Sequence, residues 1–528
     1  MDKRKNYRKL AGEQKDNLKR GPMIRTKPGF DNEKYLAEQR QAILERIEGQ
    51  SGKLYLEFGG KLIYDYHAAR VLPGFDPNVK LRLLQQLKDK VGVILCIYAG
   101  DIERSKIRAD FGISYDNATL KTIDDLKNAG ISISAVVITR FDSQSAAITF
   151  KNRLERRGIR VFTHGFTRGY PTDLDLIVSA EGYGANSYIE TENPIVVVSG
   201  PGPNSGKLAT CLSQLYHEYR CGVTASYAKF ETFPIWNLPL KHPVNMAYES
   251  ATADLRDVNM VDHFHLAAYG KTAINYNRDI EAFPLLKRIL ERITGQPSFY
   301  RSPTDMGVNR AGFGIIDDEI VREAAQQEII RRYFQYTVEY ALGQTDRETV
   351  DRAELLMKEL NLQPEDRRVV PPARDAACAA RKKHANTEGI FCGAAIELHD
   401  GTIITGKNSP LMHSCASMTL NAIKHLAQIP DTMHLLPPNI IQSLTFLKKD
   451  ILKGQKLSLD LDEILIALGL SAASNPAAQT AMQQLKELRA CEVHNSHIPS
   501  PGDAAGLRKL GVHYTSDPKY PSPELYLD

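Results

Sequence analysis

Short apolar runs of strand length alternate with amphipathic helical segments in the first half of the chain, and this alternation constrains the fold more than any other feature. Residues 91–99 and 131–139 are apolar runs, and helical periodicity follows them at residues 120–129 and 145–157. This order predicts βαβ units around a mostly parallel sheet, which is the α/β class. Because ligands of such sheets bind at the carboxyl ends of the strands, we expect a functional site in the turns that follow them.

The pattern divides the chain into four segments. In order, we predict a basic flexible tail, an N-terminal α/β domain, a helical segment with a linker, and a smaller C-terminal α/β domain, at residues 1–28, 29–317, 318–386 and 387–528. Further strands of the first domain are predicted at residues 159–163, 174–179 and 194–199.

Composition excludes several protein classes. Apolar residues make up 42% and charged residues 25%, which excludes a mainly disordered, collagen-like or disulfide-scaffold chain. The formal net charge of +4 is too small to indicate nucleic-acid binding by the whole protein. The seven cysteines include no CxxC pair, which favours reduced thiols. No apolar run approaches the roughly 20 residues of a membrane-spanning helix, so we expect a cytoplasmic protein with no membrane partner.

The strongest local signal is the run IVVVSGPGPNSGKLAT at residues 195–210. A buried strand enters a Gly/Pro-rich turn, and a lysine then opens a helix. Glycines let backbone N–H groups converge on an anion, the helix N-terminus adds about half a positive charge, and the lysine adds a full one. The turn therefore predicts a site for a phosphate-bearing ligand, and its residues are Gly200, Gly202, Asn204, Ser205, Gly206 and Lys207.

The spacing matches a standard P-loop only in part. That motif, G-x-x-x-x-G-K-[ST], needs a glycine five residues before the second one, where this chain has Pro201 between Gly200 and Gly202. Leu208 stands where the magnesium-binding hydroxyl belongs, and Ser205 or Thr210 would have to replace it. A purely structural strand–turn–helix is the alternative.

A second group of candidate residues lies at positions 254–265. Carboxylates and an imidazole within twelve residues are a possible divalent-cation site, and oxygen-rich sets suit Mg²⁺ or Mn²⁺. The candidate metal ligands are Asp254, Asp257, Asp262 and His265. The alternative is a helix with a solvated charged face, followed by a turn.

Three further residues are candidates for catalysis. Lys271 and Arg278 are cations of the kind that neutralise a transferring phosphoryl group, and Asp305 lies in a polar loop that we expect to line the same cleft. The alternative is a set of loops held by Asn and Asp hydrogen bonds to the backbone.

Several long motifs together resemble a bacterial family, the domain-of-unknown-function family eighteen forty-six. The matching stretches include KLYLEFGGKL, GYPTDLDLIVS, GPGPNSGK, YAKFETFPIWNLPLKHPVN and SPTDMGVN, and the resemblance runs from about Gly29 to about Tyr520. It implies a cytoplasmic protein with an α/β N-terminal part, a helical middle and a smaller α/β C-terminal domain. It implies no particular reaction.

The C-terminal domain also resembles the cytidine-deaminase type of α/β layer. Zinc deaminases need H-x-E followed by P-C-x-x-C, and this sequence contains no P-C-x-x-C. A metal held by His413, Cys415, Cys491 and His494 is one interpretation. Buried thiols and capping imidazoles are the alternative, with the domain serving assembly or regulation.

These residues favour a P-loop-like ATPase or phosphotransferase that uses ATP or another phosphate-bearing ligand together with Mg²⁺. Two other functions stay open. One is a non-catalytic sensor of anions or nucleotides that forms homo-oligomers, and the other is a metal-dependent hydrolase centred on Asp262 and His265.

Overall fold

The computed structural model describes residues 27–50, 52–108, 110–383, 389–454 and 456–523. Almost all of the predicted basic tail lies outside these residues. The chain forms two compact units, Lys27–Ala325 and Gln326–Asp528.

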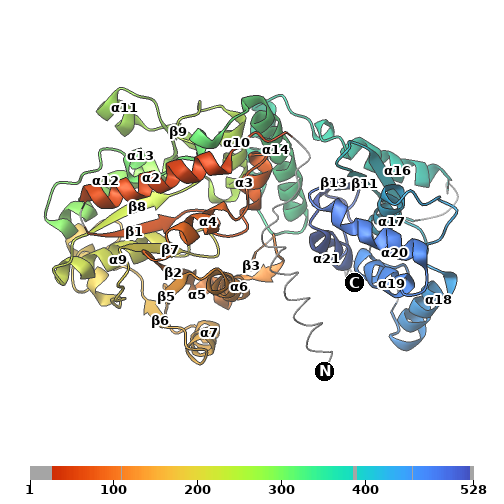
Figure 1. The fold of residues 1–528 in the computed structure, drawn as a ribbon, viewed down its shortest axis with the longest axis horizontal. Coiled ribbons are helices and arrows are strands. Elements are labelled where there is room, and N and C mark those ends of the chain that lie inside the picture. The colour runs from red at the N-terminus through yellow and green to blue at the C-terminus, as the bar shows by residue number, and fades with distance from the viewer. Residues whose placement is uncertain (1–26, 51, 109, 384–388, 455, 524–528) are drawn as a thin grey trace. The chain divides into compact units, whose positions relative to one another are not determined.

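A six-stranded parallel sheet forms the centre of the N-terminal unit, which confirms the predicted α/β class. Its strand order is β6-β5-β2-β7-β1-β8, and Figure 1 shows this succession from the lower to the upper part of the unit. The strands are β1 (Lys53–Phe58), β2 (Val91–Tyr98), β5 (Ser132–Thr139), β6 (Val161–His164), β7 (Ile195–Ser199) and β8 (Ala225–Phe230).

The strand order creates a reversal of direction at the middle of the sheet. From β2 the chain moves outward to β5 and β6, whereas from β7 it moves past β1 to β8. The loops after β2 and β7 therefore diverge at their carboxyl ends. In open α/β sheets a crevice at such a switch point is the usual place for a ligand.

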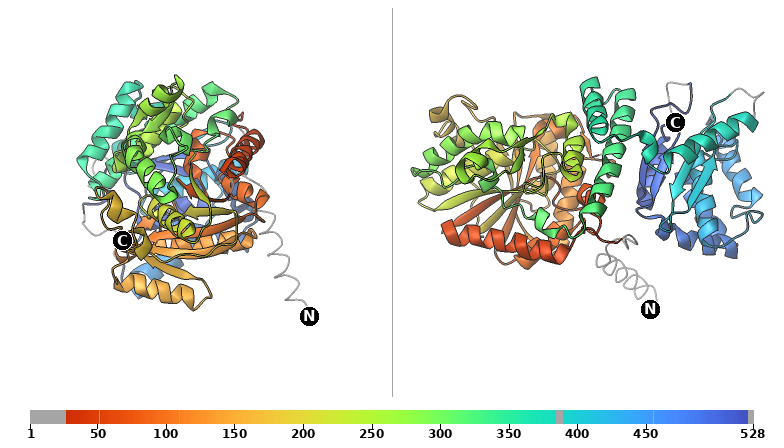
Figure 2. Two further views of the ribbon diagram at one scale, coloured as in Figure 1. Left: turned by 90° about the vertical axis from the view of Figure 1, so that its left-hand side faces the viewer. Right: turned by 90° about the horizontal axis from the view of Figure 1, so that it is seen from above.

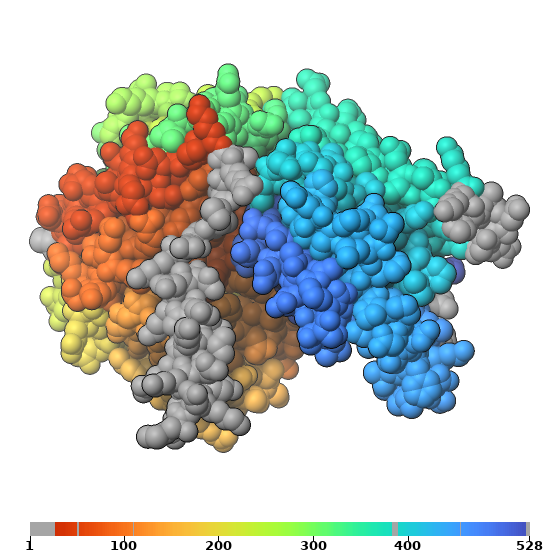
Figure 3. All heavy atoms as spheres, turned by 45° about the vertical axis from the view of Figure 1, so that its right-hand side comes forward, coloured from red at the N-terminus to blue at the C-terminus, as the bar shows by residue number. Residues whose placement is uncertain are grey.

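Helices cover the sheet because its strands are apolar on both faces. Tyr55, Ile94 and Val196 belong to one buried cluster with residues of α9 and α12, while α6 packs on β2 and β5. Helix α2 lies on the surface of this unit, where it is drawn red in Figure 3. The helices of the unit are α2 (Asn32–Gln50), α3 (Tyr66–Val71), α4 (Val79–Gln86), α5 (Ala99–Glu103), α6 (Tyr115–Asn128), α7 (Ser145–Glu155), α8 (Leu174–Ile177), α9 (Lys207–Arg220), α10 (Pro243–Ala251), α11 (His263–Tyr269), α12 (Asn277–Thr294), α13 (Pro303–Met306) and the first part of α14 (Asp318–Ala341).

Two small antiparallel hairpins complete the N-terminal unit. They are β3 (Ile107–Arg108) with β4 (Ile113–Ser114), and β9 (Asn259–Val261) with β10 (Ile274–Tyr276).

The predicted strand at residues 174–179 is wrong. This segment is the short helix α8, because the Asp173 side chain accepts a hydrogen bond from the Leu176 backbone N–H and so caps a helical turn. The apolar run is too short for periodicity to distinguish strand from helix.

The C-terminal unit is a smaller α/β arrangement around a four-stranded sheet of order β12-β11-β13-β14. β11 and β12 pair antiparallel, while β13 and β14 are parallel. Figure 2 shows helices packed on this sheet. The elements are β11 (Gly393–Glu397), β12 (Ile403–Lys407), β13 (Glu492–Asn495), β14 (His513–Ser516), α15 (Arg347–Glu359), α16 (Val370–Lys383), α17 (Ser414–Leu426), α18 (Pro438–Phe446), α19 (Leu461–Ala472), α20 (Pro476–Gln483) and α21 (Pro501–Leu510).

Candidate functional site

The segment from β7 to α9, residues 200–207, is named the glycine loop below. Asn204 and Gly206 have positive φ angles of 56° and 86°, which turn the backbone sharply before the helix. Gly206 is the N-cap of α9, and no side chain in the described part of the chain caps that helix start. No side-chain cap therefore occupies the first-turn N–H groups of α9 among the described residues.

Lys207 lies inside its own loop. Its side chain is buried, with 9% of the residue exposed. The Nζ atom donates to the Gly202 carbonyl oxygen at 3.3 Å and to the Ser205 hydroxyl at 3.4 Å. The cation is therefore held at the start of α9, where its charge adds to that of the helix N-terminus.

The carboxyl end of β5 fixes the glycine loop, although β2 separates β5 from β7 in the sheet. The Thr139 hydroxyl donates to the Ser205 carbonyl oxygen at 2.8 Å, and Arg140 Nη2 donates to the Asn204 carbonyl oxygen at 2.7 Å. Sequence reasoning did not identify these residues. Their position directly after a predicted strand was the available signal.

Two glycines of the loop, Gly202 and Gly206, lie very close to side chains of neighbouring segments. A Cβ atom at Gly202 would overlap the Tyr115 hydroxyl, and one at Gly206 would lie 2.7 Å from Thr139 side-chain atoms. A larger residue at Gly202 would displace the Tyr115 ring, and at Gly206 the positive φ angle adds to the clash with Thr139.

Acidic groups lie near the same loop. Burial and the Asp101 charge raise the pKa of Tyr115 to about 12, and Asp254 contributes to this shift.

Glu57 on β1 accepts a hydrogen bond from the Tyr227 hydroxyl at 2.8 Å. Burial and the Glu57 charge raise the pKa of Cys211 well above its usual range, and Lys207 opposes this effect. Glu57 thus acts on a residue that Lys207 also influences, whereas Asp101 and Asp254 act on Tyr115, which lies against Gly202.

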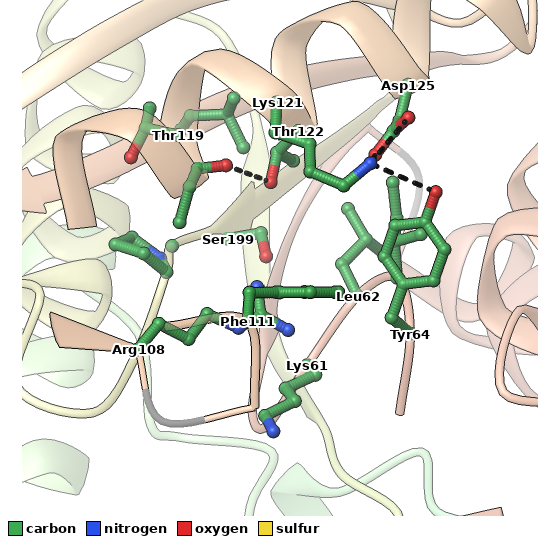
Figure 4. A pocket seen from close by; sticks show the side chains of 15 residues that line it. Lys61, Leu62, Tyr64, Arg108, Phe111, Thr119, Lys121, Thr122, Asp125 and Ser199 are labelled. Atoms are coloured by element: carbon green, nitrogen blue, oxygen red, sulfur yellow. Dashed lines mark hydrogen bonds and ion pairs between the residues drawn. The ribbon is translucent and has the colours of Figure 1, made fainter. Parts of the chain in front are cut away.

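A pocket of about 470 Å³, including its open mouth, lies at the carboxyl ends of β1, β2 and β7 (Figure 4). Ser199, Gly200 and Pro201 form part of its wall, so the pocket adjoins the start of the glycine loop. Lys61, which the sequence presents after two glycines, lines the pocket on the side opposite α6.

The other candidate metal ligands have separate structural partners. Asp262 caps α11 by accepting from the His265 N–H, and its second oxygen accepts from the Thr304 hydroxyl at 2.6 Å. Asp257 pairs with Arg278 at 2.9 Å. Burial raises the pKa of Asp257, although Arg278 opposes this shift. Within the described ranges, no cluster of three or more His, Cys, Asp or Glu side chains is suited to hold a metal ion.

The candidate catalytic residues also lie in different surroundings. Lys271 is exposed in the loop after α11, while Arg278 is held by Asp257. Asp305 accepts hydrogen bonds from the Arg301 N–H and the Tyr269 hydroxyl, and it lies 3.7 Å from His265 Nδ1. The fold therefore brings Asp305 beside His265, and no contact joins either residue to the glycine loop within the described residues.

A buried polar cluster at the carboxyl end of β8 was not identified from the sequence. Lys229 lies 3.1 Å from Glu231 and 2.5 Å from Asp279, and the Tyr276 hydroxyl donates to Glu231 at 2.6 Å. Burial raises the pKa of Glu231 to about 7, with Lys229 opposing the shift.

In the C-terminal unit the proposed metal ligands bond elsewhere. His413 pairs with Asp503 at 2.7 Å, and the Cys415 thiol donates to Asn495. His494 Nδ1 lies 2.8 Å from the Thr515 hydroxyl, and Cys491 donates to a carbonyl oxygen within its own segment. These contacts fit the alternative of buried thiols and structural imidazoles.

Comparison with known proteins identifies the family. The model described as "Domain of unknown function DUF1846, N-terminal" matches residues 28–361, and its C-terminal counterpart matches residues 365–526. The chain belongs to the DUF1846 family. The resemblance predicted from the sequence motifs is thus confirmed. The boundary between the two DUF1846 matches follows α15, whereas the two compact units divide within α14.

Curated relatives cover nearly the whole chain. A "UPF0371 protein" of Clostridium botulinum (strain Kyoto / Type A2) is 58% identical over 498 residues, which is 94% of this chain and 99% of the relative. One of Clostridium tetani (strain Massachusetts / E88) is 56% identical over 500 residues, 95% of this chain and 99% of the relative. Among the described helices of this DUF1846 protein, none combines the length and apolar character needed to cross a membrane.

Proposed function

We propose that the N-terminal unit is a cytoplasmic P-loop-like enzyme, an ATPase or phosphotransferase, that binds a phosphate-bearing ligand on the glycine loop. The observation that carries this proposal is the position of Lys207. Its buried ammonium group lies at the uncapped start of α9, in a loop whose first residues line a pocket at the switch point of the sheet.

The glycine loop supplies two interactions with a phosphate group. The N–H groups of the first turn of α9 donate to phosphate oxygens, and Lys207 exchanges its Gly202 carbonyl partner for a phosphate oxygen. A charged acceptor forms a stronger hydrogen bond than a neutral carbonyl does. Thr139 and Arg140 hold the loop so that these donors are in place before the ligand arrives.

Turnover and binding of ATP with Mg²⁺ test this function, with Lys207→Ala as the variant and Lys88→Ala, an exposed lysine, as the matched control. We expect ATP to stabilise the wild type and the control, and to be hydrolysed by both. The Lys207→Ala variant should lose both effects. Absence of nucleotide binding in the wild type, or unchanged behaviour of Lys207→Ala, contradicts the proposal.

One observation favours a second candidate function, that of an oligomeric phosphate or nucleotide sensor without turnover. Leu208 occupies the position of the usual magnesium-binding hydroxyl, and its side chain packs against the apolar core. Light scattering with and without ATP distinguishes the two functions. A ligand-dependent change of oligomeric size without product formation favours the sensor.

A further inference from the structure

The pocket beside the glycine loop carries unbalanced positive charge. Lys61 Nζ lies 2.6 Å from Asp110 Oδ2, and Arg108 Nε lies 2.9 Å from Asp110 Oδ1. Asp110 is the one carboxylate in ion-pair contact with either cation among the described side chains. Two cations thus share one negative charge, and both line the pocket.

The third cation that lines the pocket, Lys121, already has a carboxylate partner. Lys121 pairs with Asp125 one helical turn away at 3.1 Å, and it also donates to the Tyr64 hydroxyl at 3.3 Å. The net charge of the pocket is therefore +1, and it comes from the Lys61–Arg108 side. Figure 4 shows these two side chains opposite Thr119 and Thr122 of α6.

The remaining wall suits a small polyhydroxylated molecule. Thr119, Thr122 and Ser199 provide hydroxyl groups, while Phe111 closes one side with an apolar ring. The Phe111 face is covered by the Arg108 guanidinium, whose centre lies 4.7 Å from the ring centroid. That cation–π contact helps to hold Arg108 where it lines the pocket.

Because Gly200 and Pro201 belong both to the wall of the pocket and to the glycine loop, one ligand can span the two. A phosphate group would then bind at residues 202–207, and a second anionic group would meet the excess positive charge of Lys61 and Arg108.

We propose that a phosphorylated hydroxy acid or sugar acid also binds here, as substrate or product of the proposed phosphotransferase, with its phosphate on the glycine loop and its carboxylate between Lys61 and Arg108. This inference rests on the proposed function, since it takes the glycine loop as the phosphate site. It assigns a second recognition point to the same molecule. The protein would then distinguish phosphorylated acids from other phosphate compounds by their carboxylate as well as by their phosphate.

Two matched pairs of probes test the assignment by calorimetry on the full-length protein: 3-phosphoglycerate with glycerol 3-phosphate, and 6-phosphogluconate with sorbitol 6-phosphate. Within each pair only a carboxylate is exchanged for a hydroxymethyl group. A charge-assisted contact is strong enough for the acid to bind about tenfold tighter or more in at least one pair.

The variants Lys61→Gln and Arg108→Gln should remove that preference and leave the alcohol and inorganic phosphate unchanged. Lys127→Gln, on the exposed side of α6, is the control and should behave like the wild type. Equal affinities within both pairs, or equal weakening of acid and alcohol in Lys61→Gln, overturns the carboxylate site. A wild type that binds neither ATP nor any probe overturns the proposed function together with this inference, whereas a wild type that binds ATP but none of the probes overturns this inference alone.

Discussion

The Nζ atom of Lys207 lies 3.3 Å from the carbonyl oxygen of Gly202, five residues earlier in the same loop. The loop therefore solvates its own cation. Since the amine is buried and already turned toward the loop interior, a phosphate bound as we propose would replace one acceptor with another. Little reorganisation is needed, and preorganised donors of this kind favour binding of charge.

The two glycines at the ends of α9 provide a matched test of loop geometry. Gly206 and Gly222 have φ angles of +86° and +77°, but only a Cβ at Gly206 meets Thr139, while nothing lies within 4 Å at Gly222. We expect Gly222→Ala to cost about 1 kcal/mol of unfolding free energy, the usual penalty of a left-handed residue. Gly206→Ala should cost more and also abolish stabilisation by phosphate. Urea unfolding with and without phosphate measures both effects, and equal losses in the two variants would count against the clash.

Removal of the Thr139 hydroxyl should affect phosphate binding at the glycine loop more than the stability of the sheet. Thr139→Val keeps the shape of the side chain but leaves the Ser205 carbonyl oxygen without its 2.8 Å donor. We expect a loss of about 1 kcal/mol in unfolding free energy and weaker phosphate binding. Thr149→Val, which removes an exposed hydrogen bond within α7, serves as the control. Unchanged phosphate affinity in Thr139→Val would show that the loop keeps its shape without this anchor.

His164 makes stability depend on pH. Burial lowers the pKa of its imidazole from 6.5 to about 4, and its Nε2 donates to the Ser187 carbonyl oxygen at 3.2 Å. Between these two pKa values the unfolded chain binds a proton that the folded chain does not, so stability falls as pH decreases through this window. The loss attributable to this residue is about 3 kcal/mol. Urea midpoints from pH 7 to pH 4 should decrease less steeply for His164→Gln. Parallel curves for variant and wild type would exclude this residue as the cause.

Two adjacent arginines in the C-terminal unit should differ sharply in their contributions. Arg367 is 1% exposed, lies 2.5 Å from Glu492, and donates to the Thr515 hydroxyl and the Val493 carbonyl oxygen. Arg368 is exposed and pairs with Glu397. We expect Arg367→Met to cost about 3–5 kcal/mol, because it leaves buried acceptors without a partner. Arg368→Met should cost about 1 kcal/mol or less. Hydrogen exchange of the β13 and β14 amides reports the difference, and similar exchange in both variants would contradict it.

The inner strands of the sheet could be predicted because their signal is local. β2 and β7 are apolar on both faces and form uninterrupted runs, and β5 is apolar over residues 135–138. Polar residues interrupt β1 and β8, and their register explains why, since Glu57 is the partner of Lys229 across the two strands. That compensation depends on pairing between distant segments, which a single run of sequence does not reveal.

The candidate site could likewise be predicted only where its residues are consecutive in the sequence. The glycine loop is encoded in consecutive residues, so its path from β7 to α9 follows the sequence prediction. Its anchors at Thr139 and Arg140, and the pocket side chains Lys61 and Arg108, come together only through the strand order. Carboxylates close in sequence, such as Asp257 and Asp262, were a poor guide, because each bonds to a different neighbour.

The position of β7 between β1 and β2 has a consequence for biosynthesis. Both of its neighbours leave the ribosome before it, and their backbone groups remain unpaired along the facing edges until residues 195–199 emerge. A nascent chain shorter than this presents two open edges, which are prone to association with other chains. Insertion of β7 therefore closes both edges, and the glycine loop forms directly after the same strand.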